Sequence, residues 1–96
     1  MARVQFVWPS GKVDVTKTYI IPKQVTRLEA WWKAARRAIP EIPEIHLGTV
    51  RMVHSASGWM YTRHDADPKW IKFELESTSG EKAYVVIDRR ASAIGR

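Results

Sequence analysis

RLEAWWKAARRAI, residues 27–39, is the stretch that points most directly to the fold. Its apolar residues recur at the spacing of one helix face, within about 120° of one another on a helical wheel: Leu28, Trp31, Trp32, Ala35, Ala38 and Ile39. The other flank carries the charged residues Glu29, Lys33, Arg36 and Arg37. The pattern predicts an amphipathic helix that buries its tryptophans and leaves a basic flank in water.

Residues at both ends of this stretch predict where the helix begins and ends. Thr26 and Glu29 have the spacing of a capping box, in which each side chain accepts a hydrogen bond from the other residue's backbone N–H. We therefore expect the helix to begin near Arg27. Pro40 ends it, because the residue before a proline is disfavoured in helical conformation. The next segment, PEIPEI (40–45), is expected to be an extended connector because of its two prolines.

The segment before the helix has the pattern of a β-hairpin. Apolar residues alternate with polar ones over Arg3–Trp8 and again over Val13–Ile21. PSGK separates the two runs, and its proline and glycine favour a tight turn.

After the connector, the pattern changes to β-strands separated by the turn sequences SASG, HDADP and STSG. We expect four strands in an antiparallel meander: Ile45–His54, Trp59–Arg63, Trp70–Glu76 and Lys82–Asp88. In the third of these the apolar and charged residues alternate, which is typical of a sheet with one buried face and one wet face. The element order ββαββββ predicts a two-layer α+β domain in which the helix covers the buried face.

Length and composition support one domain. A chain of 96 residues fits a single cored unit, which we place at residues 1–88, with 89–96 as a basic, flexible tail. The chain has no cysteine, so neither disulfides nor thiolate metal sites contribute to its stability. No apolar run has the length of a signal peptide or a membrane span, and we expect a cytoplasmic protein that does not associate with membranes.

The net charge favours an anionic partner. The chain has 16 Lys and Arg against 10 Asp and Glu, a formal charge of +6 and a pI near 10.0. The excess is spread along the chain, so its effect depends on how the fold gathers it. Lys33, Arg36 and Arg37 are the main candidates for phosphate contact, because one helix presents all three. They have a simpler interpretation as the solvated face of a helix, with Lys33 paired to Glu29.

Further candidates come from the strand after SASG and from the C-terminal segment. Trp59, Tyr61 and Arg63 share one strand face if the period of two holds. On a wet face they would form a stacking platform for nucleic-acid bases, and on a dry face they would belong to the core. Arg89 and Arg90 would add weak attraction to phosphates.

Metal and catalytic sites have weak support. His64, Asp65 and Asp67 could bind a divalent metal, but the aspartates are explained by turn formation, and no motif with metal-ligand spacing is present. The sequence likewise has no nucleophile motif and no phosphate-binding loop. We therefore expect neither an enzyme nor a metal or cofactor site.

These observations leave two leading functional hypotheses, and a third with weaker support, metal-dependent hydrolysis at His64, Asp65 and Asp67. The first is a small non-enzymatic domain that binds DNA or RNA through Lys33, Arg36 and Arg37, helped by Arg89 and Arg90. In this hypothesis Trp59 or Tyr61 stacks on the bases. The alternative is a protein-binding module or inhibitor, encoded by a mobile element, that acts on a host protein which handles nucleic acid. Such a module would use an aromatic patch or an open sheet edge, and an open edge would also permit a homodimer.

Overall fold

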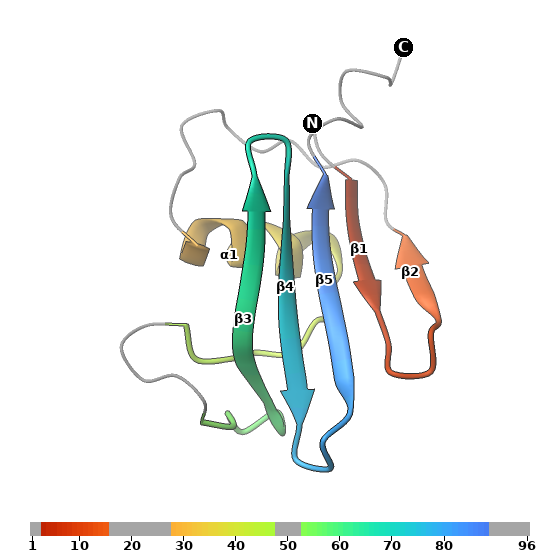
Figure 1. Ribbon diagram of the computed structural model, residues 1–96, viewed down its shortest axis with the longest axis vertical. Helices are drawn as coiled ribbons and strands as arrows, with labels where there is room; N and C mark the ends of the chain where they lie inside the picture. Colours follow the sequence, from red (N-terminus) through yellow and green to blue (C-terminus); the bar gives the residue numbers. More distant parts are fainter. Residues whose placement is uncertain (1–2, 16–27, 48–52, 89–96) are drawn as a thin grey trace.

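The computed structural model describes residues 3–15, 28–47 and 53–88 (Figure 1). Its elements are β1 (Arg3–Val7), β2 (Val13–Val15), α1 (Leu28–Ala38), β3 (Trp59–Asp67), β4 (Trp70–Ser77) and β5 (Lys82–Asp88). The hairpin, the helix and the last two strands lie where the sequence predicts them. Thr26 of the capping box, residues 16–21 of the second predicted strand and the tail 89–96 lie outside the described residues.

The strands form one antiparallel sheet in the order β2-β1-β5-β4-β3. β1 pairs with β5, so that Phe6 lies opposite Val85, and this pairing joins the N-terminal hairpin to the C-terminal strands. The predicted α+β fold, one helix on an antiparallel sheet, is confirmed. The C-terminal meander differs from the prediction, because in the described part of the chain it has three strands, β3, β4 and β5, rather than four.

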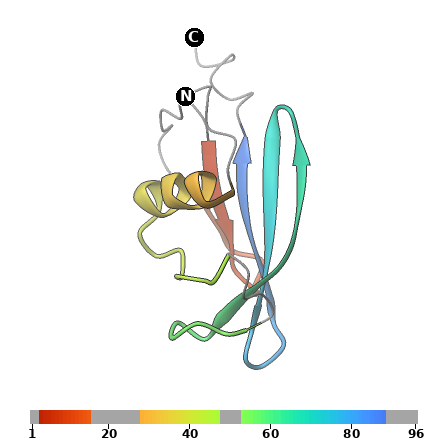
Figure 2. The ribbon, with the colours of Figure 1, turned by 90° about the vertical axis from the view of Figure 1, so that its left-hand side faces the viewer.

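Helix α1 covers one face of the sheet, and no other described helix or strand covers the opposite face, which we call the open face (Figure 2). Trp31, Trp32 and Ala35 are buried, as the helical pattern predicts. The rings of Trp32 and Phe73 pack edge to face, with centroids 5.1 Å apart. Alternate residues of the strands complete the core beneath the helix, namely Val4, Phe6, Tyr61, Ile71, Phe73, Leu75, Ala83, Val85 and Ile87. This layer of interdigitated apolar side chains fixes where α1 lies on the sheet.

The prediction of a strand over Ile45–His54 is wrong, as far as the structure describes these residues. Residues 45–47 and 53–54 have no strand structure, and 48–52 lie outside the described ranges. Ile45 is buried, His46 is exposed and Leu47 is half-buried, so burial alternates here as it would along a strand. The burial has another origin, since Ile45 belongs to the same core cluster as α1 and Leu47 packs against that cluster.

Strand β3 is longer than the sequence suggests. The turn predicted over HDADP is confined to Pro68 and Lys69, and β3 continues to Asp67. The backbone N–H of Lys69 donates a hydrogen bond of 2.9 Å to Oδ1 of Asp67, which is the local bond expected of an aspartate before proline. Pairing with β4 overrides the turn propensity of His64 and Asp65, because each residue opposes a β4 partner.

The described ranges, 3–15, 28–47 and 53–88, contain no helix that is long and apolar enough to cross a membrane.

Phe73 provides a test of the core. Its side chain is fully buried in β4, so we expect Phe73→Ala to lower the free energy of unfolding by about 3–5 kcal/mol, because the substitution removes apolar contacts and leaves a cavity. Urea unfolding followed by circular dichroism measures the change. Val13→Ala is the control, since Val13 is 45% exposed and should change stability by less than about 0.5 kcal/mol. Similar losses for both variants would contradict this core.

Candidate functional site

The basic flank of α1 borders a groove of about 500 Å³. The helix contributes Glu29, Trp32, Lys33, Arg36 and Arg37 to its lining, and the segment after the helix contributes Pro40, Glu44, Ile45 and Leu47. The three helix cations predicted from the sequence as binding residues therefore lie at one concave site. A site of this volume is within the range that small ligands or parts of larger ones occupy.

Arg36 has a structural contact as well as a charge. Its Nε donates a hydrogen bond of 3.1 Å to the backbone oxygen of Ile42, and its side chain is half-buried. The bond ties the segment after the helix to α1 and restricts the rotamers of Arg36. A guanidinium group has five N–H donors, so those on its terminal nitrogens remain for a ligand.

Lys33 and Arg37 are exposed on the same flank. The sequence suggests that Glu29 neutralises Lys33, but no ion pair joins these residues in the structure. No ion pair involves Arg37 among the described residues either. Both cations are therefore available to an anion at the groove.

The inner wall of the groove is apolar. Trp32 is only 5% exposed, Ile45 is buried and Leu47 is half-buried. The indole N–H of Trp32 is buried, and it has no acceptor among the described residues. A buried donor without a partner costs about 1–3 kcal/mol. The groove thus combines an apolar wall with three cations and two carboxylates, those of Glu29 and Glu44.

Two serines hold the far side of the groove in place. Ser57 donates a hydrogen bond of 2.6 Å to the backbone oxygen of Glu44, and Ser55 donates to the same oxygen. The sequence identifies SASG as a turn, which is confirmed by the bond from Gly58 N–H to the Ser55 oxygen. It does not reveal that this turn fastens the segment 40–47. The buried isoleucines of PEIPEI, three residues apart, were the available indication that this segment packs against the helix.

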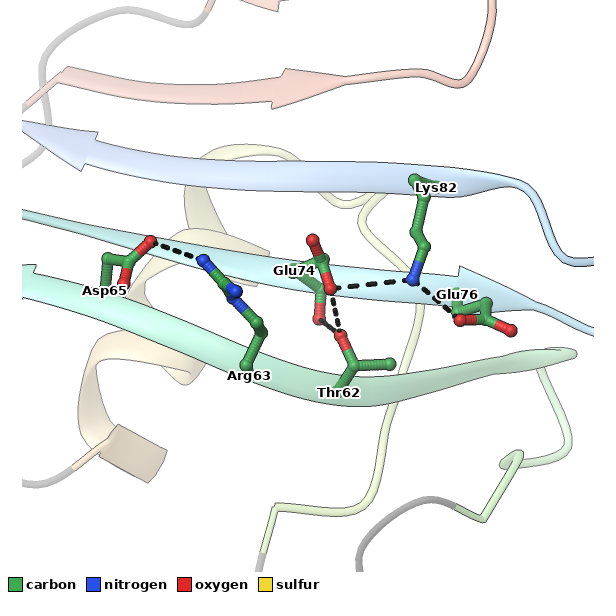
Figure 3. Close-up of polar contacts among 6 residues, drawn as sticks. All are labelled: Thr62, Arg63, Asp65, Glu74, Glu76 and Lys82. Carbon is green, nitrogen blue, oxygen red and sulfur yellow. Dashed lines mark hydrogen bonds and ion pairs between the residues drawn. The ribbon is translucent and has the colours of Figure 1, made fainter.

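The open face of the sheet carries charges that are paired with one another (Figure 3). Lys82 of β5 contacts Glu76 at 2.7 Å and Glu74 at 3.6 Å, both on β4. On β3, Arg63 contacts Asp65 at 3.2 Å. Lys72, on the same face, lies 4.5 Å from the centre of the Tyr84 ring. Two of these three cations thus have acidic partners, whereas no ion pair involves the described cations on the flank of α1.

Trp59, Tyr61 and Arg63 do not share a face, contrary to the period-two expectation. Tyr61 lies opposite Leu75 and Arg63 lies opposite Glu74, with a register shift between them. The extra residue, Thr62, forms a β-bulge, which reverses the alternation of faces. Tyr61 is 2% exposed on the core side, whereas Arg63 is exposed on the open face.

Trp59 is half-buried and packs against the core. The three residues therefore do not form the stacking platform that one interpretation of the sequence required. Arg89 and Arg90, the other predicted contacts, lie outside the described residues.

The residues of HDAD point in different directions. His64 Nδ1 and the hydroxyl of Tyr61 are 2.5 Å apart, and His64 lies opposite Phe73 on the core side. Asp65 lies opposite Lys72 on the open face. Among residues 3–15, 28–47 and 53–88, no group of three or more histidine or acidic residues is placed to hold a metal ion.

The distribution of charge differs between the described residues and the rest of the chain. The described residues include all ten Asp and Glu but only nine of the 16 Lys and Arg. The other seven cations, Lys17, Lys23, Arg27, Arg51, Arg89, Arg90 and Arg96, are at positions outside these ranges. The described ranges therefore hold one more acidic residue than basic residues, and three of their nine cations lie on the flank of α1.

Comparisons with family models, with curated proteins and with solved structures gave no match to this chain.

The pKa of Glu74 allows a test of the open face. The hydrogen bond from the Thr62 hydroxyl, 2.7 Å from Oε1, lowers this pKa, with help from the charges of Lys82 and Arg63, while burial opposes the effect. A carboxyl group with a lowered pKa in the folded state stabilises the fold above its unfolded pKa. That contribution is lost as the pH falls through the folded pKa.

We expect Thr62→Val to raise the pKa of Glu74 toward its ordinary value and to reduce the loss of stability between pH 7 and pH 3. Carbon NMR of the carboxyl group and urea unfolding at both pH values measure these changes. The exposed Thr78→Val is the control and should leave the pKa of Glu74 unchanged. The same pH dependence in wild type and Thr62→Val would show that this hydrogen bond does not stabilise the ionised carboxylate.

Proposed function

We propose that the chain is a small, non-enzymatic nucleic-acid-binding domain that contacts phosphates through Lys33, Arg36 and Arg37. The observation that carries the proposal is the convergence of these three cations on one groove of about 500 Å³. Phosphate oxygens accept hydrogen bonds from lysine and arginine, and such contacts supply affinity without reading sequence. The proposed mechanism is charge attraction with release of counterions.

The three cations have different roles in this proposal. Arg36 is held by the Ile42 carbonyl, so it would present its terminal nitrogens in a fixed direction, which suits a two-bond contact with one phosphate. Lys33 and Arg37 are exposed and would contact neighbouring phosphates along the groove. Arg89 and Arg90 remain predicted additional contacts. The proposal assigns no stacking role to Tyr61, because its side chain is buried.

The salt dependence of the binding affinity distinguishes this function from the alternative, a protein-binding module. Three phosphate contacts on duplex DNA predict a slope of about −2.7 in a plot of log K against log salt, which is roughly a 40-fold loss of affinity between 50 and 200 mM. Binding to labelled DNA and RNA oligonucleotides, single-stranded and double-stranded, is measured by fluorescence anisotropy. A slope near zero would contradict phosphate contact and favour a protein partner.

Lys33→Glu/Arg37→Glu tests the site directly. We expect this double variant to weaken binding by at least tenfold and to reduce the salt slope by about two, because two phosphate contacts are lost. Arg36 is left intact, since replacing it would also remove the hydrogen bond to Ile42. Circular dichroism and thermal unfolding establish that the variant folds.

The matched control is Lys12→Glu/Lys69→Glu, which makes the same change in net charge at exposed positions that do not line the groove. It should change affinity only slightly. Equal weakening by both double variants would show that net charge, and not the groove, determines binding, and the proposed site would then be wrong.

A further inference from the structure

Among the described strands β3 ends the sheet, and none of them pairs with its outer edge. In the order β2-β1-β5-β4-β3, β3 pairs with β4 on one side, and no other described strand pairs with it. The backbone groups on an open edge can pair with another strand. Natural sheets often discourage this with charged side chains, and β3 carries three of them after its bulge, Arg63, Asp65 and Asp67.

These three charged residues lie on the same face of the sheet. Arg63, Asp65 and Asp67 lie opposite Glu74, Lys72 and Trp70 in a register that is regular from Arg63 onward. The side chains of Arg63 and Asp65 are 66% and 58% exposed and form an ion pair at 3.2 Å. The outer edge of β3 therefore presents a fixed sequence of charges to any strand that pairs with it.

Symmetry restricts how two copies of β3 can pair. Two identical strands that pair antiparallel at a sheet edge are related by a two-fold axis perpendicular to the sheet, so opposed residues lie on the same face. An axis at Arg63 places two arginines opposite each other. An axis at Asp65 opposes Arg63 to Asp67 of the other copy, but it places two aspartates opposite each other at its centre. An axis at Ala66 opposes Asp65 to Asp67 of the other copy, and an axis at Asp67 opposes two aspartates.

Only an axis at His64 avoids like charges among these registers. It places Arg63 of each copy opposite Asp65 of the other, so that four charges of alternating sign form a rectangle on the open face. Opposed side chains in an antiparallel pair have Cβ atoms about 5 Å apart, within reach of an ion pair. In this register both charged cross-strand pairs are of opposite sign, whereas each of the other registers contains at least one like-charged pair.

We propose that β3 pairs with β3 of a second copy of this chain, with the two-fold axis at His64. The two sheets then form one continuous antiparallel sheet, and the two α1 helices lie on the same side of it. Pairing is limited at one end by the bulge at Thr62, so the contact is short and the dimer is weak and concentration-dependent. The proposal does not depend on nucleic-acid binding.

Complementary charge variants test the register. In a homodimer of the Arg63→Asp variant, residues 63 and 65 of opposite copies are both aspartates. In a homodimer of the Asp65→Arg variant they are both arginines. We expect each variant alone to be monomeric at concentrations where the wild type dimerises. An equimolar mixture of the two should form a heterodimer, because both of its cross-strand pairs are again of opposite charge.

Sedimentation velocity over about 10 μM to 1 mM measures association, and circular dichroism establishes that each variant is folded. Lys69→Glu, outside the paired segment, is the control and should dimerise like the wild type. A wild type that stays monomeric at 1 mM would overturn the proposal. So would folded single variants that still dimerise, or single variants that are monomeric and stay monomeric when mixed.

Discussion

The packing of α1 against the centre of the sheet is the interaction on which the rest of the structure depends. Trp32 meets Phe73 edge to face at 5.1 Å, and Trp31 and Ala35 bury the same side of the helix. Two buried tryptophans supply a large share of the apolar area of a small core. Because they fix the rotation of α1 about its axis, they also determine that Lys33 and Arg37 point away from the sheet.

The segment 40–47 turns that exposed flank into a groove. Ile42 and Ile45 are buried, and Arg36 and the two serines of the SASG turn hold the backbone of the segment at Ile42 and Glu44. A helix flank alone would be a convex, solvated surface. With a second wall beside it, the same cations border a concavity that has an apolar side, and an anion bound there loses less to solvent screening.

The bulge in β3 has a comparable effect on the open face. One extra residue moves Arg63 from the core side to the open face, where it joins the charges of β4 and β5. Tyr61 stays in the core and shares a short contact with His64. A single register shift therefore separates side chains that strict alternation would group, and it gives the end strand its exposed charge pattern.

The sequence by itself determined the hairpin, the helix and the strands β4 and β5, together with the burial of Trp31 and Trp32. These features follow from local periodicity of 2 or 3.6 residues and from proline and glycine positions, which need no knowledge of distant segments. The helical period of the sequence also places Lys33, Arg36 and Arg37 on one flank of the helix.

Only the tertiary structure decided where the segment 40–47 packs, where β3 shifts register and which side chains border the groove. Burial alternates over Ile45, His46 and Leu47 as it would in a strand, but Ile45 and Leu47 are covered because they pack with the core cluster beneath α1. The turn tendency of HDAD likewise yields to pairing with β4. Each of these outcomes depends on contacts between residues far apart in the chain, whose free energy exceeds the weak local preferences that a sequence pattern expresses.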